Sequence, residues 1–243
     1  MSTPPPGAAG RLPRAMITLI NLPSTVVGED LEVLAEHERE RAGRFHFEHD
    51  RAAFITTRAS LRRLLAEETR LPADQLQLPS DPNGRPFWAG ADLDPPAARL
   101  DFNVSHSGPV AAIGISRGRR IGVDVEWHGR QRSLRDLEDQ VMGPAEKAML
   151  RELDDAAHLK AFLACWTRKE ALVKAIGLGL SYPVTTIDLP LVPPDRLVRL
   201  GEGPSDLWSI LTSDEPGYTL SIAVAGSGMD VVIERPPTSL RRD

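Results

Sequence analysis

Two acidic residues, Asp124 and Glu126, stand two positions apart in an otherwise apolar segment, IGVDVEW at residues 121–127. Successive side chains of a β-strand point to opposite faces, so a strand here would carry an apolar face and, opposite to it, two neighbouring carboxylates. Like charges at that spacing repel, and a half-buried carboxylate costs free energy unless something compensates it. Mg²⁺ prefers hard oxygen ligands of this kind and would remove the repulsion. The alternative is an edge strand whose polar face is exposed to water.

A third carboxylate lies in the segment WTRKEALVKAIG at residues 166–177, which has a helical pattern. Trp166, Glu170 and Lys174 fall at i, i+4 and i+8 and therefore share one side of the predicted helix. Glu170 could complete a shell of three carboxylates with Asp124 and Glu126. A glutamate four residues before a lysine is also an ordinary helix-stabilising pair, and the spacing alone leaves that alternative open.

Lysine is rare in this chain, which makes its positions informative. Of 29 basic residues only four are lysine, namely Lys147, Lys160, Lys169 and Lys174. An arginine side chain cannot release a proton at working pH, whereas a lysine side chain can. A site that needs a proton donor would therefore select lysine, and Lys169 and Lys174 flank Glu170.

The segment FNVSHSG at residues 102–108 indicates a phosphate site. As a strand it places Asn103, Ser105 and Ser107 on one face and His106 on the other, so the adjacent serine and histidine are not a catalytic pair. A histidine backed by arginines is a plausible phosphate ligand, although a lone histidine is more often structural. The arginines available for this role are Arg58 and Arg62 on a predicted helix and Arg85 in a turn.

The elements that must position these residues alternate between short strands and a few helices. We expect strands at 16–22, 101–108, 109–116 and 121–127, helices at 29–45, 51–69, 143–153 and 158–177, and strand-like pieces at 71–88 and in the tail, TTIDLPL, LWSIL and YTLSIAVAG. Both halves then contain a short polar helix, a long amphipathic helix and strands, which predicts an α+β fold. We expect a disordered leader at 1–15, α+β halves at 16–118 and 119–232, and a flexible tail at 233–243.

Composition excludes several classes of protein. The 243 residues carry a net charge of −5 with 41% hydrophobic residues, a balance that argues against a nucleic-acid partner. No apolar run is long enough to span a membrane, and the Pro/Gly-rich N-terminus has no signal-peptide core. Cys165 is the only cysteine, so an internal disulfide and a cysteine-based zinc site are both excluded. We expect a cytoplasmic protein.

Three of these segments, in this order, resemble the motifs of the 4'-phosphopantetheinyl transferases, the large monomeric type that activates surfactin synthetase. The family pattern is Phe-Asn-x-Ser-His, then Gly-(Ile/Val)-Asp-x-Glu, then Trp-x-x-Lys-Glu-(Ala/Ser)-x-x-Lys, which stand here as FNVSHSG, GVDVEW and WTRKEALVK. The Gly-Leu-Gly-Leu after the helix, the Asn-Gly-Arg-Pro turn and RAGRF at 41–45 also fit, so the resemblance covers residues 28 to 190. It implies two similar α+β halves related by a pseudo-twofold axis, with the active site between them.

The resemblance also implies an activity. Coenzyme A would be the donor, Mg²⁺ the cofactor, and a serine of an acyl or peptidyl carrier protein the acceptor, in fatty-acid, polyketide or non-ribosomal peptide synthesis. The products would be the holo carrier protein and 3',5'-ADP. The protein would act as a monomer, because its two halves supply a cleft that smaller relatives build from separate subunits.

The family's site residues carry over onto matching positions of this chain. Asp124, Glu126 and Glu170 correspond to the Mg²⁺ ligands, Glu170 also to the general base, and Lys174 to the group that stabilises the departing 3',5'-ADP. The positions that contact coenzyme A correspond to Ser105 and His106 at the 3'-phosphate, Arg85 in place of a more usual lysine, Arg41 and Arg58 by a looser alignment, and Lys169 and Lys174 of the helical motif.

Two other functions stay open at this point. One is a coenzyme A or nucleotide-binding regulatory module without catalysis, and the other is a purely structural α+β protein with an acidic edge. For an acidic carrier protein we expect an apolar docking surface with some arginine near residues 130 to 153. The candidate arginines there are Arg130, Arg132 and Arg135.

Overall fold

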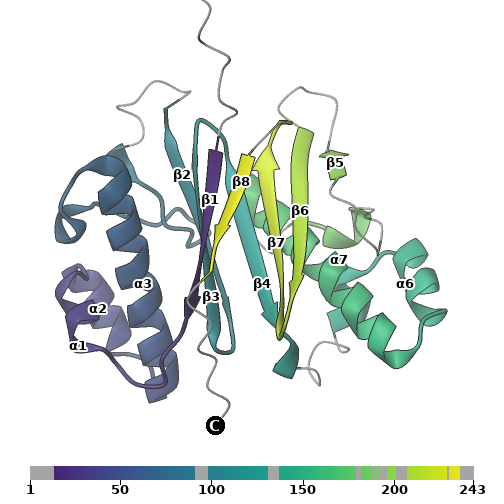
Figure 1. The fold of residues 1–243 in the computed structure, drawn as a ribbon, viewed down its shortest axis with the longest axis horizontal. Helices are drawn as coiled ribbons and strands as arrows, with labels where there is room; N and C mark the ends of the chain where they lie inside the picture. Colours follow the sequence, from purple (N-terminus) through teal and green to yellow (C-terminus); the bar gives the residue numbers. More distant parts are fainter. Residues whose placement is uncertain are drawn as a thin grey trace, which may run out of the picture.

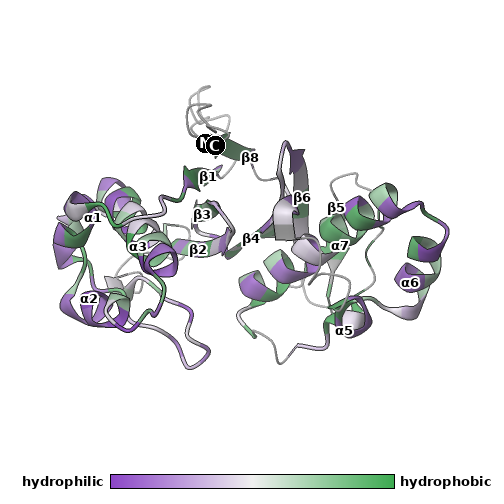
Figure 2. Cartoon of the chain, turned by 90° about the horizontal axis from the view of Figure 1, so that it is seen from below, coloured by the Kyte–Doolittle hydropathy of each residue, from purple (hydrophilic) through white to green (hydrophobic). Residues whose placement is uncertain are grey.

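Two four-stranded sheets lie back to back between two layers of helices (Figures 1 and 2). The computed structural model describes residues 14–90, 98–130, 137–178, 182–187, 189, 191, 196–200, 207–228 and 230–235. The expected leader at residues 1–15 therefore lies almost wholly outside the described residues, as does most of the expected tail.

The first sheet has the strand order β2-β3-β1-β8 and is covered by the long helix α3. Its strands are β1 (Arg14–Asn21), β2 (Leu100–Ser107), β3 (Val110–Arg117) and β8 (Asp230–Glu234), and its helices are α1 (Gly28–Glu32), α2 (Glu36–Ala42) and α3 (Glu48–Thr69). The predicted helix 29–45 is in fact two short helices. The segment 71–88 forms a 3₁₀ turn and then a tight loop closed by one bridge, Ser80 to Pro86.

The second sheet has the order β4-β7-β6-β5 and is covered by α7. Its strands are β4 (Ile121–Trp127), β5 (Arg196–Arg199), β6 (Leu207–Glu215) and β7 (Tyr218–Ala225), and its helices are α5 (Glu138–Val141), α6 (Pro144–Arg151) and α7 (Asp155–Ile176). The tail segment TTIDLPL was wrongly predicted as a strand, because its first residues form a 3₁₀ turn at Val184–Thr186.

The two halves repeat one arrangement, which confirms the predicted α+β class. In each half an opening strand, β1 or β4, leads through helices to a hairpin, β2–β3 or β6–β7, whose second strand pairs antiparallel with the opening strand. The long helices α3 and α7 are both 22 residues long.

Each half also contains the same buried ion pair. Glu38, three residues into α2, accepts from the N–H of Ala35 and from Arg62 of α3 at 2.6 Å. Glu146 holds the equivalent place in α6, where it accepts from the N–H of Gly143 and from Lys169 of α7 at 2.5 Å. Arg62 and Lys169 are both completely buried, so each joins a short helix to a long one.

The chain crosses between the halves a second time at its end. β8 pairs in parallel with β1 of the first sheet, with Asp230 opposite Arg14 and Glu234 opposite Thr18. The expected division near residue 118 falls in the turn between β3 and β4, but the expected assignment of residues up to 232 to the second half did not include this return.

The inner faces of the two sheets pack on each other and form the central core. Ile17 of β1, Val123 of β4 and Ile222 of β7 belong to this cluster and are at most 1% exposed. The apolar face of IGVDVEW is therefore buried between the sheets, while Asp124 and Glu126 face α7. This arrangement decides where the acidic pair can act.

Strand β4 meets β2 through side chains rather than through a backbone ladder. Along β2, every second side chain accepts a hydrogen bond from a backbone N–H of β4. These bonds join Ile121 to Asp101 at 2.8 Å, Val123 to Asn103 at 3.0 Å, Val125 to Ser105 at 3.4 Å and Trp127 to Ser107 at 3.1 Å. We call this set of contacts the seam; it joins the two halves and satisfies donors that the edge of β4 would otherwise leave unpaired.

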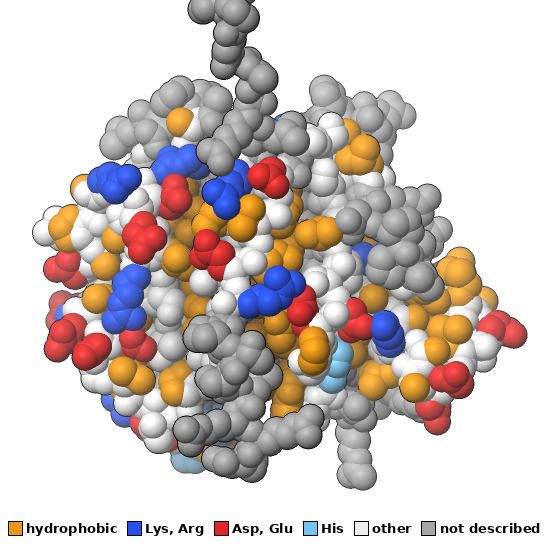
Figure 3. All heavy atoms as spheres, viewed as in Figure 1, with side chains coloured by type: hydrophobic (Ala, Val, Ile, Leu, Met, Phe, Trp, Pro, Cys, Tyr) orange, Lys and Arg blue, Asp and Glu red, His pale blue; other side chains and the backbone are white. Residues whose placement is uncertain are grey.

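The described surface mixes charges of both signs. Figure 3 shows basic and acidic side chains interspersed over one face, with apolar side chains between them. Among the helices that the structure describes, none is both long enough and apolar enough to cross a membrane.

The close approach of β4 to α7 depends on Gly122, and it gives a testable prediction. A Cβ atom at Gly122 would lie 2.0 Å from the carbonyl oxygen of Ala171 and 2.5 Å from the nitrogen of Ala175, both in the backbone of α7. Gly122→Ala should therefore lower the free energy of unfolding by about 1–3 kcal/mol, as overpacking does, in urea titrations. Gly28→Ala is the control, since nothing lies within 4 Å of its Cβ position. Equal stability of the two variants would contradict this account.

Candidate active site

Asp124 lies in the middle of β4 and is buried, with one oxygen engaged and one oxygen open. Its Oδ1 accepts from Ser105 Oγ at 2.8 Å and from Lys174 Nζ at 2.6 Å. Its Oδ2 is buried without a hydrogen-bond partner. An orphaned carboxylate oxygen in the interior is costly unless a ligand or an ion completes it.

Glu126 lies two residues further along the same face. Its Oε2 accepts from Ser107 Oγ at 2.7 Å, and its Oε1 accepts from the indole N–H of Trp166 on α7 at 3.3 Å. The carboxylate is thus held from both halves of the molecule.

Glu170 on α7 completes the acidic group. Burial, together with the nearby charges of Asp124 and Glu126, raises the pKa of Glu170 from its ordinary 4.5 to about 7, although the charge of Lys174 opposes the shift. The three carboxylates selected from the sequence therefore act on one another electrostatically.

These side chains fit a hard divalent cation. All three donors are carboxylates, one oxygen of Asp124 is orphaned, and the mutual repulsion would fall if a cation entered. They do not form a finished shell, because within the described part of the chain no group of three His, Cys, Asp or Glu side chains is already placed to hold a metal ion. The ammonium group of Lys174 now compensates Asp124.

Lys174 lies between the acidic group and a cavity. Its side chain is 28% exposed, and Nζ also contacts Ser105 Oγ at 2.9 Å. The cavity has a volume of about 260 Å³ and is lined by the turn at Asn83–Pro86, by β2 and by the end of α7. A small ring system placed here would lie beside the lysine.

Arg85 forms one wall of this cavity and joins three segments. Its guanidinium donates to the Asp101 carboxylate at 3.0 and 3.1 Å, to the carbonyl of Ile121 at 3.0 Å and to the carbonyl of Lys174. Burial raises the pKa of Asp101, and the charge of Arg85 opposes that shift. The predicted phosphate ligand is therefore first a clamp between β2, β4 and α7.

Two basic residues are corrections. Lys169, predicted to contact coenzyme A, and Arg62, considered as a phosphate ligand, are both completely buried in the paired ion bridges, so neither can reach a ligand. Ser105 contacts the acidic group, because its Oγ donates to Asp124. His106 is exposed and lines a separate cavity of about 590 Å³ with His49 and Trp127.

Arg41 and Arg58 lie together on the first half, away from the acidic group. Arg58 pairs with Glu38 at 3.0 Å, and Arg41 stacks over the ring of Phe54. Burial lowers the pKa of Arg58, and the neighbouring charges of Arg62 and Arg41 add to this shift while Glu38 opposes it. Of the arginines proposed for docking, Arg132 and Arg135 lie outside the described residues, and so does the side chain of Arg130.

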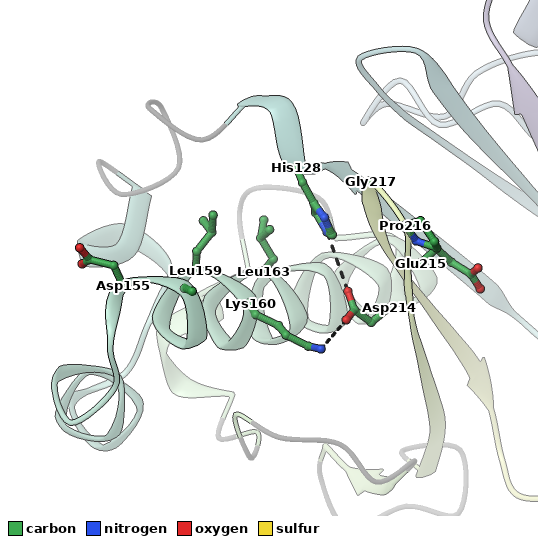
Figure 4. A pocket seen from close by; sticks show the side chains of 10 residues that line it. His128, Asp155, Leu159, Lys160, Leu163, Asp214, Glu215, Pro216 and Gly217 are labelled. Atoms are coloured by element: carbon green, nitrogen blue, oxygen red, sulfur yellow. Dashed lines mark ion pairs between the residues drawn. The ribbon is translucent and has the colours of Figure 1, made fainter. Parts of the chain in front are cut away.

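A cavity of about 780 Å³ lies near the start of α7, lined by Leu159 and Leu163 of α7, by His128 and by the turn between β6 and β7. Trp166 and Glu170 follow Leu163 at helical spacing along α7, and His128 follows Glu126 after the end of β4. Figure 4 shows Asp214 between His128 and Lys160 at the wall of this cavity, 2.6 Å from the lysine.

Sequence reasoning missed the donors around the acidic group. Ser107 was placed on the correct strand face and Trp166 on the same helix side as Glu170, but neither was connected with Glu126. The available signal was the matching spacing of Ser105 and Ser107 with Asp124 and Glu126. Two strands in contact bring alternate residues together, so this spacing could have predicted the two serine–carboxylate pairs.

Comparisons with known proteins agree along most of the chain. The family model described as 4'-phosphopantetheinyl transferase superfamily matches residues 120–223, and the one described as 4'-phosphopantetheinyl transferase, N-terminal, matches residues 27–116. The chain is 29% identical over 210 residues to the 4'-phosphopantetheinyl transferase HetI of Nostoc, covering 86% of each chain. It is 32% identical over 188 residues to a Synechocystis protein named as a 4'-phosphopantetheinyl transferase, covering 77% of this chain and 73% of the relative.

More distant similarities extend to animals. The human L-aminoadipate-semialdehyde dehydrogenase-phosphopantetheinyl transferase is 28% identical over 162 residues, which are 64% of this chain and 52% of that protein. The solved structure of Thermotoga maritima holo-[acyl-carrier-protein] synthase matches 44% of this chain and 62% of its own, at 19% identity and a TM-score of 0.36.

The clamp made by Arg85 predicts a loss of stability on substitution. Arg85→Ala should lower the free energy of unfolding by about 1–3 kcal/mol, because the partly buried acceptors at Asp101, Ile121 and Lys174 lose their donor. Arg85→Lys should recover only part of this, since one ammonium cannot reproduce the planar fork. Urea titrations measure both, with the exposed Arg44→Ala as control. A clamp of no consequence would leave Arg85→Ala as stable as the control.

The raised pKa of Glu170 predicts a pH dependence of stability in metal-free buffer. The unfolded chain loses the Glu170 proton near pH 4.5 and the folded chain near pH 7, so the folded state binds more protons in between. Its contribution to the free energy of unfolding should therefore fall as pH rises from about 4.5 to 7 and stay constant above. Urea titrations from pH 5 to 8 should show Glu170→Gln without this decline. An unchanged slope in that variant would assign it to another group.

Proposed function

The chain belongs to the 4'-phosphopantetheinyl transferase superfamily, and from this premise we propose that its acidic group, Asp124, Glu126 and Glu170, carries the reaction. The enzyme transfers the 4'-phosphopantetheine group of coenzyme A to carrier proteins. The acceptor is a serine hydroxyl, and 3',5'-ADP is released. The observation that carries the assignment is the orphaned Oδ2 of buried Asp124 beside two further carboxylates and one lysine.

Coenzyme A and Mg²⁺ fit different parts of the site. Members of this family use coenzyme A as donor, generally with a divalent metal. We assign the metal to Asp124, Glu126 and Glu170, where a bound Mg²⁺ would neutralise charge on the diphosphate as the phosphoanhydride breaks. Support comes from the oxygen-only donor set and from the pKa of Glu170, which burial and the neighbouring carboxylates raise together.

Glu170 has the properties of a general base. A pKa of about 7 lies near the operating pH, where a carboxylate can both accept a proton and give it up. In the proposed reaction Glu170 takes the proton of the carrier serine, directly or through a water, as the hydroxyl attacks phosphorus. A cation at the site would favour the ionised form of Glu170 and so prepare it for this step.

Lys174 is proposed to serve the leaving group. Its ammonium group now lies 2.6 Å from Asp124 Oδ1 and also borders the cavity beside Arg85. Once a divalent cation compensates Asp124, the ammonium group can donate to the phosphate oxygen of the departing 3',5'-ADP. The long, flexible lysine side chain suits this exchange better than the planar arginine fork.

The linear donor is proposed to run past the acidic group from one cavity to another. We place its nucleotide end in the cavity beside Arg85 and Lys174, its diphosphate at the acidic group and its pantetheine arm toward the cavity between His128 and Leu163. Ser105, beside Asp124 and Lys174, is the proposed contact of the 3'-phosphate on this path, whereas His106 lines a separate cavity and Arg41 and Arg58 lie away from the acidic group. The enzyme would act as a monomer in the cytoplasm on an apo carrier protein.

A non-catalytic module that only binds coenzyme A is not favoured. The carboxylates and the lysine that such a module could lose are all present and close together. The relatives found are themselves named as transferases. In a structural protein with an acidic edge, Asp124 would be exposed to water and the edge of β4 would be uncovered. Here Asp124 is buried and the seam covers that edge.

Mass spectrometry of an apo carrier protein tests the proposal. With coenzyme A and Mg²⁺ the carrier should gain one phosphopantetheine group. Asp124→Ala should slow transfer by about 10³-fold, because several kcal/mol of transition-state stabilisation depend on the metal. The control is Asp139→Ala, an exposed carboxylate on α5. Full activity in Asp124→Ala, with a folded protein, would remove the metal assignment.

Thermal unfolding gives a second test that needs no carrier protein. Ligands that bind only the folded state raise the melting temperature. Coenzyme A should stabilise the protein more in the presence of Mg²⁺ than in EDTA. Equal stabilisation under both conditions would support binding without a catalytic metal, and none at all would support a structural protein.

A further inference from the structure

Glu126 is held at both of its carboxylate oxygens. Ser107 Oγ donates to Oε2 at 2.7 Å, and Trp166 Nε1 donates to Oε1 at 3.3 Å. A donor at each oxygen fixes the direction in which a carboxylate points. Ser107 and Trp166 thus orient Glu126.

The direction of the Ser107 bond follows from its second partner. Ser107 is 2% exposed, and its Oγ accepts the backbone N–H of Trp127 at 3.1 Å. A hydroxyl has one proton, and an ionised carboxylate can only accept. The Ser107 proton is therefore committed to Glu126 Oε2.

The two donors come from different halves of the molecule. Ser107 ends β2 of the first half, and Trp166 lies on α7 of the second half, one helical turn before Glu170. They hold the two oxygens of one carboxylate, so its orientation depends on how the halves are joined. The neighbouring pair, Ser105 and Asp124, repeats the serine half of this arrangement two residues earlier.

We propose that Ser107 and Trp166 are positioning residues that hold Glu126 in the orientation required by the divalent cation; this rests on the function proposed above. Hydrogen-bond partners of metal-ligating carboxylates orient the ligands, and removing one commonly weakens metal binding by about 10–100-fold. Because Ser107 and Trp166 act through Glu126, their proposed effect is on cation affinity.

A set of variants distinguishes a positioning role of Ser107 and Trp166 from a purely structural role. Trp166→Phe removes the N–H donor and keeps most of the ring, whereas Ser107→Ala also leaves the partly buried N–H of Trp127 without an acceptor. Ser107→Thr retains the hydroxyl and serves as the rescue. The controls are Ser116→Ala, a buried serine of β3 whose hydroxyl has no partner, and Trp208→Phe, a buried indole in the core beside α7.

Binding of coenzyme A, measured by calorimetry over a series of Mg²⁺ concentrations, gives the first readout. Trp166→Phe and Ser107→Ala should each need about 10–100-fold more Mg²⁺ for half-maximal affinity, while Ser107→Thr and both controls match the wild type. Direct binding of Mn²⁺, counted from the EPR signal of the free ion, should show the same order. Transfer by the two variants should recover at saturating Mg²⁺, in contrast to Asp124→Ala.

The outcomes distinguish the two proposals. If the wild type depends on Mg²⁺ but Trp166→Phe and Ser107→Ala need the same concentration as the wild type, the positioning role is wrong and the proposed function stands. If they lose transfer equally at every Mg²⁺ concentration, their role is structural and the inference is again wrong. If the wild type neither binds coenzyme A in a Mg²⁺-dependent way nor transfers its arm, the proposed function fails and this inference fails with it.

Discussion

The seam between β2 and β4 is the contact on which the rest of this structure depends. An ordinary continuous sheet would pair the two strands by backbone hydrogen bonds and would leave their side chains above and below. Here side chains of β2 take that place, so Ser105 and Ser107 meet the backbone of β4 and also the carboxylates that β4 carries. One row of short polar residues thereby joins the halves and organises the acidic group at the join.

The second constraint is the free-energy cost of gathering three carboxylates. Lys174 and the neutral donors offset part of this cost. The part that remains is visible in the raised pKa of Glu170 and in the orphaned oxygen of Asp124. The buried bridges Glu38–Arg62 and Glu146–Lys169 show the opposite solution, since there each carboxylate has a cation and a helix N–H. Incomplete compensation therefore distinguishes the acidic group from these two buried bridges.

Much of this could be predicted from the sequence, because the strongest patterns lie on the elements that build the site. The apolar alternation of IGVDVEW fixed which way Asp124 and Glu126 point, and the helical spacing of residues 166–174 placed Glu170 on the side that faces them. The fold class followed from the repeated order of elements. The return of β8 could not be predicted, since five residues of ordinary strand pattern do not specify which sheet they join.

Lys169 shows where residue type misleads. Its rarity and its place beside Glu170 indicated a functional lysine, but adjacent helical residues point about 100° apart, and Lys169 faces the interior toward Glu146. Arg85 shows the same limit: a basic residue in a turn can be recognised, but its acceptors on three distant segments cannot. In both cases the deciding partner is a buried group far away in the sequence.

The pairing of β8 with β1 has a consequence for how the molecule comes apart. The last strand of the chain lies beside the first, and between them the chain has passed through both halves. Neither half is therefore a closed module. A fragment ending at the β3–β4 turn would keep the pairing of β1 with β3 but would lose β8 from the other edge of β1. The complementary fragment would expose an unpaired β8. We expect such fragments to fold poorly alone and to reassemble when mixed, and the intact chain to melt in one cooperative transition.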